Sequence, residues 1–298
     1  MEYHNPVLLQ ESVDGLNIKP DGIYVDVTFG GGGHSKEILS RLGENGKLYA
    51  FDQDEDAIAN KIDDPRFTLI NENFRFIKRF LRFHNVKEVD GILGDFGVSS
   101  HQFDVAERGF STRFEAKLDM RMSRRGNLSA YEVINDYDEQ QLKTMFYEYA
   151  DLRIAPKIAA EIVKAREESP IESSERLKEV LRPYLFKEKE HKIWAQIDQA
   201  IRIEVNQELE VLREFLKQTD ELIKKGGRLS LISYHSLEDR LVKRYIRSGL
   251  FEGEPEKDFY GNISVPFKKV GGLIVPTDEE IARNKRARSA RLRVAKKL

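Results

Sequence analysis

Residues 23–34 read Ile-Tyr-Val-Asp-Val-Thr-Phe-Gly-Gly-Gly-Gly-His. The first seven are mostly β-branched or aromatic, which is typical of a buried strand, and the four glycines end that strand abruptly. Ser35 can cap a helix after the glycines, and Ile38, Leu39 and Leu42 recur at helical spacing. The stretch therefore predicts a strand, a glycine loop and a helix in direct succession.

The same alternation continues to about residue 95. Strand-like segments lie at 47–52, 67–70 and 89–95, with helical segments around Ala57 and at 75–84. This order predicts a doubly wound α/β fold with a parallel sheet, in which ligands bind beyond the carboxyl ends of the strands. The glycine loop, Asp52 and Asp95 all fall at those ends.

A second region is helical in pattern. Strand signals disappear for some 70 residues after 127, and capping patterns begin at Ser129 and Asp138. We expect an all-helical domain at 123–196, inserted into an α/β domain made of 1–122 and 197–298. Beyond it we expect one amphipathic helix over 201–223, a further strand at 228–233, a helix at 237–246 and a hairpin turn at 270–273.

Composition excludes several classes. The chain has 298 residues, no cysteine and a formal charge of −2, with 49 Lys and Arg against 51 Asp and Glu. A disulfide scaffold and a Cys-ligated zinc protein are excluded, and 40% hydrophobic residues argue against a disordered chain. No apolar stretch is long enough for a membrane span, and no histidines have metal-ligand spacing, so we expect a cytoplasmic protein without a bound metal.

The strand ends carry the residues suited to chemistry. Asp52 follows Gly30 by 22 residues, which suits a ribose diol beside a glycine loop and indicates an adenosine-type cofactor. The third glycine of the dinucleotide pattern would stand at Ser35, so the cofactor stays open. Asp95-Phe96-Gly97 matches a kinase magnesium motif but lacks the kinase context. An acid there can instead accept a hydrogen bond from an exocyclic amine.

Several ordered motifs carry a resemblance. Taken together, the chain resembles the ribosomal RNA small subunit methyltransferase H family (MraW-like) through the segments His4-Asn5-Pro6-Val7-Leu8-Leu9, 25–35, Asp95-Phe96-Gly97-Val98-Ser99-Ser100, Arg108-Gly109-Phe110-Ser111, Leu118-Asp119-Met120-Arg121-Met122, 199–206 and 232–240. The resemblance implies a Rossmann-like class I sheet with an inserted helical substrate-recognition domain. It implies an S-adenosyl-L-methionine-dependent enzyme that methylates N4 of a cytidine in the decoding region of 16S rRNA, in the small ribosomal subunit. The cofactor positions that it implies are Gly32, Gly33, His34, Asp52, Phe74, Asp95 and Gln102.

The remaining site residues are hypotheses about the reaction and the RNA. We expect Asp95 to accept a hydrogen bond from the N4 amine, with Ser99 and His235 as neighbours. A target base must leave its stack, and Phe110 and Tyr234 are candidates to stack on it. Arginines suited to phosphate contacts lie in the loop after 107 and in a basic tail over 281–298, namely Arg108, Arg113, Arg121, Arg124, Arg125, Arg288, Arg291 and Arg293.

Two other functions stay open at this point. A nicotinamide-dependent dehydrogenase could use the same sheet, although Ser35 weakens its fingerprint. A non-catalytic ribosome-assembly factor could have kept the fold, although the intact set of Gly32, Gly33, His34, Asp52 and Asp95 argues against a retired site. The oligomeric state, and whether naked rRNA or assembled subunits are the substrate, do not follow from the sequence.

Overall fold

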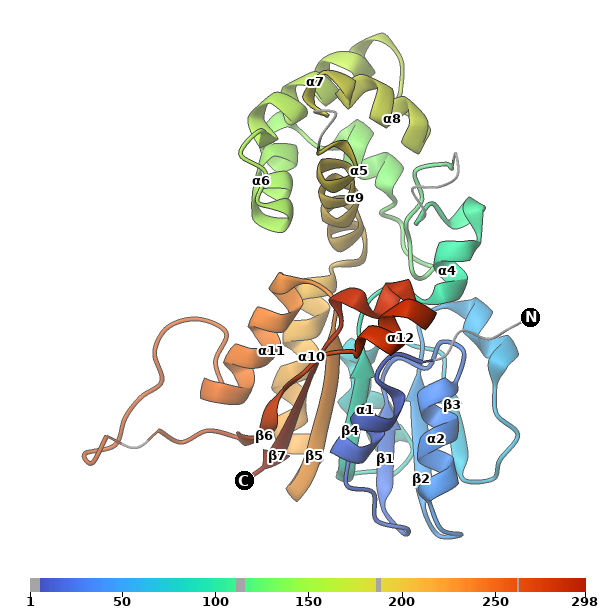
Figure 1. The fold of residues 1–298 in the computed structure, drawn as a ribbon, viewed down its shortest axis with the longest axis vertical. Coiled ribbons are helices and arrows are strands. Elements are labelled where there is room, and N and C mark those ends of the chain that lie inside the picture. The colour runs from blue at the N-terminus through green and yellow to red at the C-terminus, as the bar shows by residue number, and fades with distance from the viewer. Residues whose placement is uncertain (1–5, 111–115, 186–188, 262) are drawn as a thin grey trace. The chain divides into compact units, whose positions relative to one another are not determined.

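The computed structural model describes residues 6–110, 116–185, 189–261 and 263–298 (Figure 1). The chain divides into two compact units. The first comprises 1–97 and 209–298, and the second comprises 98–208. Each unit has its own hydrophobic core, so each is described by itself.

A seven-stranded sheet forms the centre of the first unit. The strand order is β3-β2-β1-β4-β5-β7-β6, and β7 runs antiparallel to both of its neighbours. This is the strand order of the class I methyltransferase sheet, so the expected α/β fold class is confirmed. The strands are β1 (Ile23–Asp26), β2 (Lys47–Phe51), β3 (Phe67–Ile70), β4 (Val89–Asp95), β5 (Ile223–Ser233), β6 (Phe267–Ile274) and β7 (Arg291–Lys297).

Helices pack on this sheet through their apolar faces. In α2, for example, Ile38 and Leu39 are buried in a cluster with Leu48 of β2, as helical spacing predicts. The helices of this unit are α1 (Leu9–Gly15), α2 (Gly33–Arg41), α3 (Ile77–Phe83), α10 (Glu208–Leu222), α11 (Ser236–Ser248) and α12 (Asp278–Arg283). The expected short helix near Ala57 is the 3-10 helix η1 (Glu55–Asn60).

The C-terminal region differs from the expectation of a basic tail. Residues 291–297 form β7, which lies between β5 and β6 in the sheet. Leu292 and Val294 point into a buried cluster, while the arginines alternate with them along the strand. The prediction of a hairpin turn at 270–273 is also wrong, because these residues lie inside β6. The pairing register of β6 with β7 shifts between Val270 and Ile274.

The second unit is helical. Its helices are α4 (Ser100–Asp104), α5 (Ala130–Asp136), α6 (Glu139–Ala150), α7 (Ala155–Glu168), α8 (Ser174–Leu181) and α9 (Glu190–Asn206). The expected limits of the insertion, 123 and 196, fall inside this unit. The reason is that the preceding segment packs with the helices: Leu118 N–H donates to Glu172 O, and Met120 is buried in the same core.

The long helix expected over 201–223 is two helices. α9 ends at Asn206, the next residue, Gln207, has a left-handed φ of 51°, and α10 begins at Glu208. The left-handed residue ends the run of helical hydrogen bonds, although the apolar stripe continues on both sides. Among the described residues, no helix has both the length and the apolarity that crossing a bilayer demands.

Candidate cofactor and catalytic site

The glycine loop and Asp52 meet at the carboxyl edge of the sheet, as their spacing predicts. Gly30 N–H donates to Asp52 Oδ2 at 2.7 Å, and Asp54 N–H donates to Asp52 Oδ1 at 2.8 Å. Adjacent parallel strands β1 and β2 place the two segments side by side. Burial raises the pKa of Asp52 to about 6, against the opposing effect of the two amide donors. Its carboxylate is therefore held by backbone groups at the loop.

The N-terminal segment packs against the same loop. A Cβ on Gly33 would lie 2.1 Å from Pro6 Cγ, so only glycine fits beside the proline ring. One residue later, His34 is 6% exposed and its Nε2 lies 3.1 Å from Val7 O. Pro6 and Val7 belong to a motif that carried the resemblance, but no role for them follows from the residues alone. In the structure, both residues contact the first turn of α2.

Asp95 ends β4 at this edge and is held from several sides. Its backbone N–H donates to Thr28 Oγ1 at 2.7 Å, and its Oδ1 accepts a 2.7 Å hydrogen bond from the Tyr234 hydroxyl. His34 Nδ1 lies 4.0 Å from the other carboxylate oxygen, Oδ2. Burial raises the pKa of Asp95 to about 6, although His34 and the Tyr234 hydroxyl act in the opposite direction.

Tyr234 follows β5 and is positioned by its backbone. Its N–H donates to Glu238 Oε2 at 2.8 Å, and its ring passes close to Gly97, where a Cβ would lie 3.2 Å from Tyr234 Cδ2. Gly97 also has a φ of 114°, which disfavours any other residue. In this structure the hydroxyl of Tyr234 binds Asp95, and the expected stacking of its ring on a base stays a prediction.

The expected neighbours Ser99 and His235 and the expected cofactor residue Gln102 take part in helix capping. Ser99 and Gln102 form a reciprocal capping box at the start of α4, in the second unit. His235 caps α11, and its Nε2 lies 3.1 Å from Glu238 Oε1. Their parts in cofactor binding or catalysis stay predictions.

Phe74 lies in the 3-10 helix η2 (Phe74–Phe76) and packs on two aromatic rings of the first unit. Its ring centroid is 5.8 Å from that of Phe96 and 5.3 Å from that of Phe215. Phe74 itself is partly exposed, whereas Phe215 is fully buried. Phe96 and Phe215 therefore hold the ring of Phe74 in place while part of it stays exposed. An exposed ring of this kind suits contact with a planar base.

Comparison with known proteins decides the family. The sequence model described as the MraW methylase family matches residues 1–298. The chain belongs to this family. Curated relatives named "Ribosomal RNA small subunit methyltransferase H" include one from Christiangramia forsetii, 76% identical over 100% of this chain and 99% of its own length. Another with that name, from Flavobacterium johnsoniae, is 70% identical over the same shares, and one from Bacteroides fragilis is 55% identical over 99% of this chain and 97% of its own. The family expected from the motifs is confirmed.

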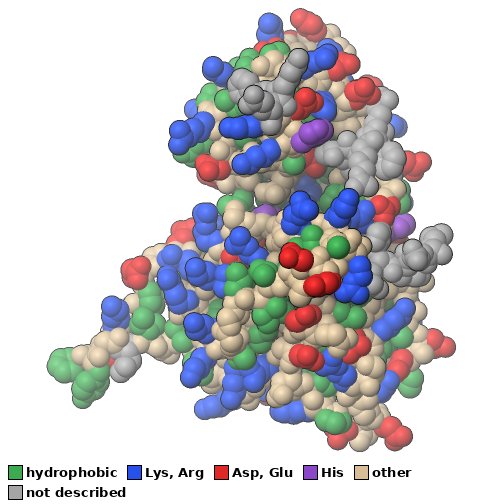
Figure 2. All heavy atoms as spheres, in the orientation of Figure 1, with side chains coloured by type: hydrophobic (Ala, Val, Ile, Leu, Met, Phe, Trp, Pro, Cys, Tyr) green, Lys and Arg blue, Asp and Glu red, His purple; other side chains and the backbone are tan. Residues whose placement is uncertain are grey.

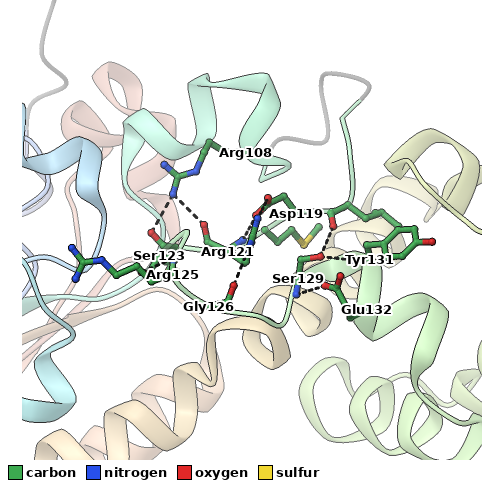
Figure 3. A network of polar contacts seen from close by, with 12 residues as sticks. Arg108, Asp119, Arg121, Ser123, Arg125, Gly126, Ser129, Tyr131 and Glu132 are labelled. Carbon is green, nitrogen blue, oxygen red and sulfur yellow. Dashed lines mark hydrogen bonds and ion pairs between the residues drawn. The ribbon is translucent and has the colours of Figure 1, made fainter.

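In this methylase, the arginines expected to hold RNA fall into different groups. Arg108 is 2% exposed and donates through Nη2 to the carbonyls of Arg121 and Met122, both at 3.1 Å. Arg121 in turn binds the Asp119 carboxylate at 2.8 Å and Gly126 O at 2.9 Å (Figure 3). These two side chains hold the loop together in this structure, so their availability for phosphates is limited.

Other expected RNA residues of the methylase differ in exposure. Phe110 is 2% exposed in the core of the second unit, so its ring has no free face for a base here. Arg124 and Arg125 are exposed, and Arg125 points away from the Arg108 network (Figure 3). Arg113 lies outside the described residues.

The C-terminal arginines of the methylase are also divided. Arg293 Nε donates to Asp239 Oδ1 at 2.7 Å, and Arg291 Nη1 lies 3.3 Å from Asp239 Oδ2. Arg288 is exposed and lines a pocket of about 520 Å³ with Arg291 and with Tyr234 and His235, which lie more than 50 residues earlier. The pocket thus brings the predicted RNA-binding arginines of the C-terminal region next to the predicted site residues Tyr234 and His235. On the face of the molecule shown in Figure 2, both units carry basic and acidic side chains.

Proposed function

We propose that this chain transfers a methyl group from S-adenosylmethionine to N4 of a cytidine in the 16S rRNA of the small ribosomal subunit. The observation that carries the proposal is Asp95. Its carboxylate is fixed at the carboxyl edge of a class I sheet, beside a glycine loop whose partner acid, Asp52, suits a ribose. The names of the relatives, which describe those proteins as ribosomal RNA small subunit methyltransferases, also support the proposal.

The residues at this edge fit S-adenosylmethionine. Asp52 offers carboxylate lone pairs to the ribose hydroxyls, and the partly exposed ring of Phe74 offers a surface to the adenine. The first turn of α2 follows the glycine loop, and its backbone N–H groups favour the carboxylate of the methionine part. When bound, the cofactor supplies an electrophilic methyl group.

Asp95 answers the main chemical difficulty of the reaction. The N4 lone pair of cytosine is delocalised into the ring, so the amine must be turned before it can attack. A carboxylate that accepts an N4–H hydrogen bond orients the amine and later takes its proton. Holding two reactants in near-attack geometry contributes on the order of 7–11 kcal/mol, so positioning accounts for a large share of the rate.

RNA contacts would come from exposed basic groups. Arg288, in the pocket of the first unit, and Arg124 and Arg125, in the second unit, are exposed in this structure. Phosphate contacts by such side chains position an RNA without reading its sequence. We assign substrate recognition to the helical second unit, residues 98–208, in place of the narrower 123–196 expected from the sequence.

Methyl incorporation tests the proposal. Purified protein, radiolabelled S-adenosylmethionine and either naked 16S rRNA or assembled small subunits are combined, and nuclease digests are analysed for N4-methylcytidine by mass spectrometry. We expect product with wild type and a loss of at least 100-fold in kcat in Asp95→Asn, measured at saturating S-adenosylmethionine. A non-catalytic assembly factor would bind subunits without product, and a dehydrogenase would bind NAD in preference to S-adenosylmethionine.

A further inference from the structure

The two oxygens of the Asp95 carboxylate have different surroundings. Oδ1 accepts the Tyr234 hydroxyl at 2.7 Å, whereas Oδ2 faces His34 Nδ1 at 4.0 Å. A phenol hydroxyl has one proton to donate, so it fixes Oδ1 as an acceptor. Oδ2 is therefore the oxygen left to take a proton from a substrate.

The backbone determines which nitrogen of His34 can serve as an acceptor. His34 Nε2 lies 3.1 Å from Val7 O, and a carbonyl oxygen can only accept. Nε2 must therefore carry the hydrogen. In the neutral ring, Nδ1 then holds the lone pair, and that nitrogen is the one that faces Asp95 Oδ2. The ring is 6% exposed, so water does not compete freely for it.

We propose that Tyr234 and His34 are the positioning residues of Asp95: Tyr234 locks Oδ1 in place, and His34 Nδ1 receives the proton that Oδ2 takes from the substrate amine. This inference rests on the function proposed above. In that reaction, the N4 lone pair forms the new N–C bond, and the electron pair of the broken C–S bond goes to sulfur. One proton leaves the cationic N4 for Oδ2 and moves on to His34 Nδ1, which restores the carboxylate; for this transfer the 4.0 Å separation of Oδ2 and Nδ1 must tighten to hydrogen-bond distance in the substrate complex.

Other charged groups around Asp95 oppose its ionisation. Asp26 of β1 and Glu238 of α11 both raise its pKa, while His34 and Tyr234 lower it. Asp26 is itself fully buried and accepts a hydrogen bond from Ser35 Oγ at 2.7 Å. Loss of either partner should therefore raise the pKa of Asp95 further and favour the protonated carboxyl, which cannot accept another proton.

The test compares Tyr234→Phe and His34→Gln with wild type. The control is Tyr245→Phe, which removes a buried hydroxyl of α11 in the same unit without touching Asp95. Two quantities are measured: the acid limb of the kcat profile, and the ¹³C carboxyl titration of Asp95 in the protein without cofactor, assigned by its disappearance in Asp95→Asn. Thermal unfolding verifies that each variant is folded.

We expect the Asp95 titration and the acid limb to move to higher pH by about one unit in Tyr234→Phe and in His34→Gln, and to stay in place in Tyr245→Phe. We also expect kcat to fall more than tenfold in His34→Gln above the acid limb. An active wild type with unmoved titrations in both variants would overturn this inference and leave the methyltransferase proposal standing. An inactive wild type with shifted titrations would count against the proposed function alone.

Discussion

The contact between Gly33 and the N-terminal segment gives a quantitative prediction. In Gly33→Ala, the new Cβ would lie 2.1 Å from Pro6 Cγ, while carbon atoms in contact normally sit about 3.5–4.0 Å apart. The proline ring must retreat by about 1.5 Å. Overpacking of this kind costs about 1–3 kcal/mol. The retreat also pulls Val7 O away from His34 Nε2, which forfeits a hydrogen bond of about 1 kcal/mol.

A double-mutant cycle measures this contact. Pro6→Ala removes Cγ and Cδ and leaves Cβ, which lies 3.3 Å from the place that a Cβ on residue 33 would take and needs only a small adjustment. We expect Gly33→Ala to lower the free energy of unfolding by about 2 kcal/mol and Gly33→Ala with Pro6→Ala to recover most of it. Chemical denaturation measures all three variants, and calorimetric titration with S-adenosylmethionine should show weaker binding in Gly33→Ala.

Gly272→Ala is the matched control for this cycle. No atom lies within 4 Å of a Cβ at Gly272, yet the substitution reduces the entropy of the unfolded chain in the same way. Equal unfolding free energies for Gly33→Ala and Gly272→Ala would refute the reasoning. So would a double variant no more stable than Gly33→Ala alone.

Three further predictions concern stability. Deleting residues 291–298 removes the strand paired with both β5 and β6, so circular dichroism should show no cooperative unfolding; a normal transition would contradict the sheet order. Asp239→Ala leaves Arg293 without its carboxylate and should cost about 2–4 kcal/mol in urea denaturation, whereas a loss below about 0.5 kcal/mol would show that the pair adds little. Asp52 has a raised pKa in the folded protein, so its contribution to stability is present at low pH and is lost as pH rises through about 6. The unfolding free energy of wild type relative to Asp52→Asn should accordingly fall by about 2–3 kcal/mol between pH 3 and pH 8, and a rise over that range would reverse the assignment.

Local signals explain the parts of the fold that the sequence predicts well. The strands expected at 67–70 and 89–95 have these bounds in the structure, because runs of apolar and β-branched residues end at turn residues. The meeting of Gly30 and Asp52 was also predictable. Two parallel strands joined by one helix end at the same edge, so a spacing of 22 residues fixes their neighbourhood.

Contacts whose partner is remote in the sequence could not be predicted. Arg293 was expected in an RNA-binding basic tail, and nothing in the tail reveals that its side chain binds Asp239, 54 residues earlier on another element. Tyr234 looks like a stacking platform, and nothing near it in the chain reveals that its hydroxyl reaches Asp95, 139 residues away. Periodicity reports which face of a strand is buried, but it does not report which polar group meets a side chain across the sheet.

Several residues of the site act only by holding other residues in place. Gly33, Gly97 and Thr28 contribute no reactive group, yet they determine where Pro6, Tyr234 and the backbone of Asp95 lie. A site deduced from reactive residue types alone finds Asp95 and misses what holds it. In the proposed reaction, the Asp95 carboxylate acts chiefly through its orientation and its protonation state, so these supporting residues should affect the rate as strongly as residues that touch the substrate.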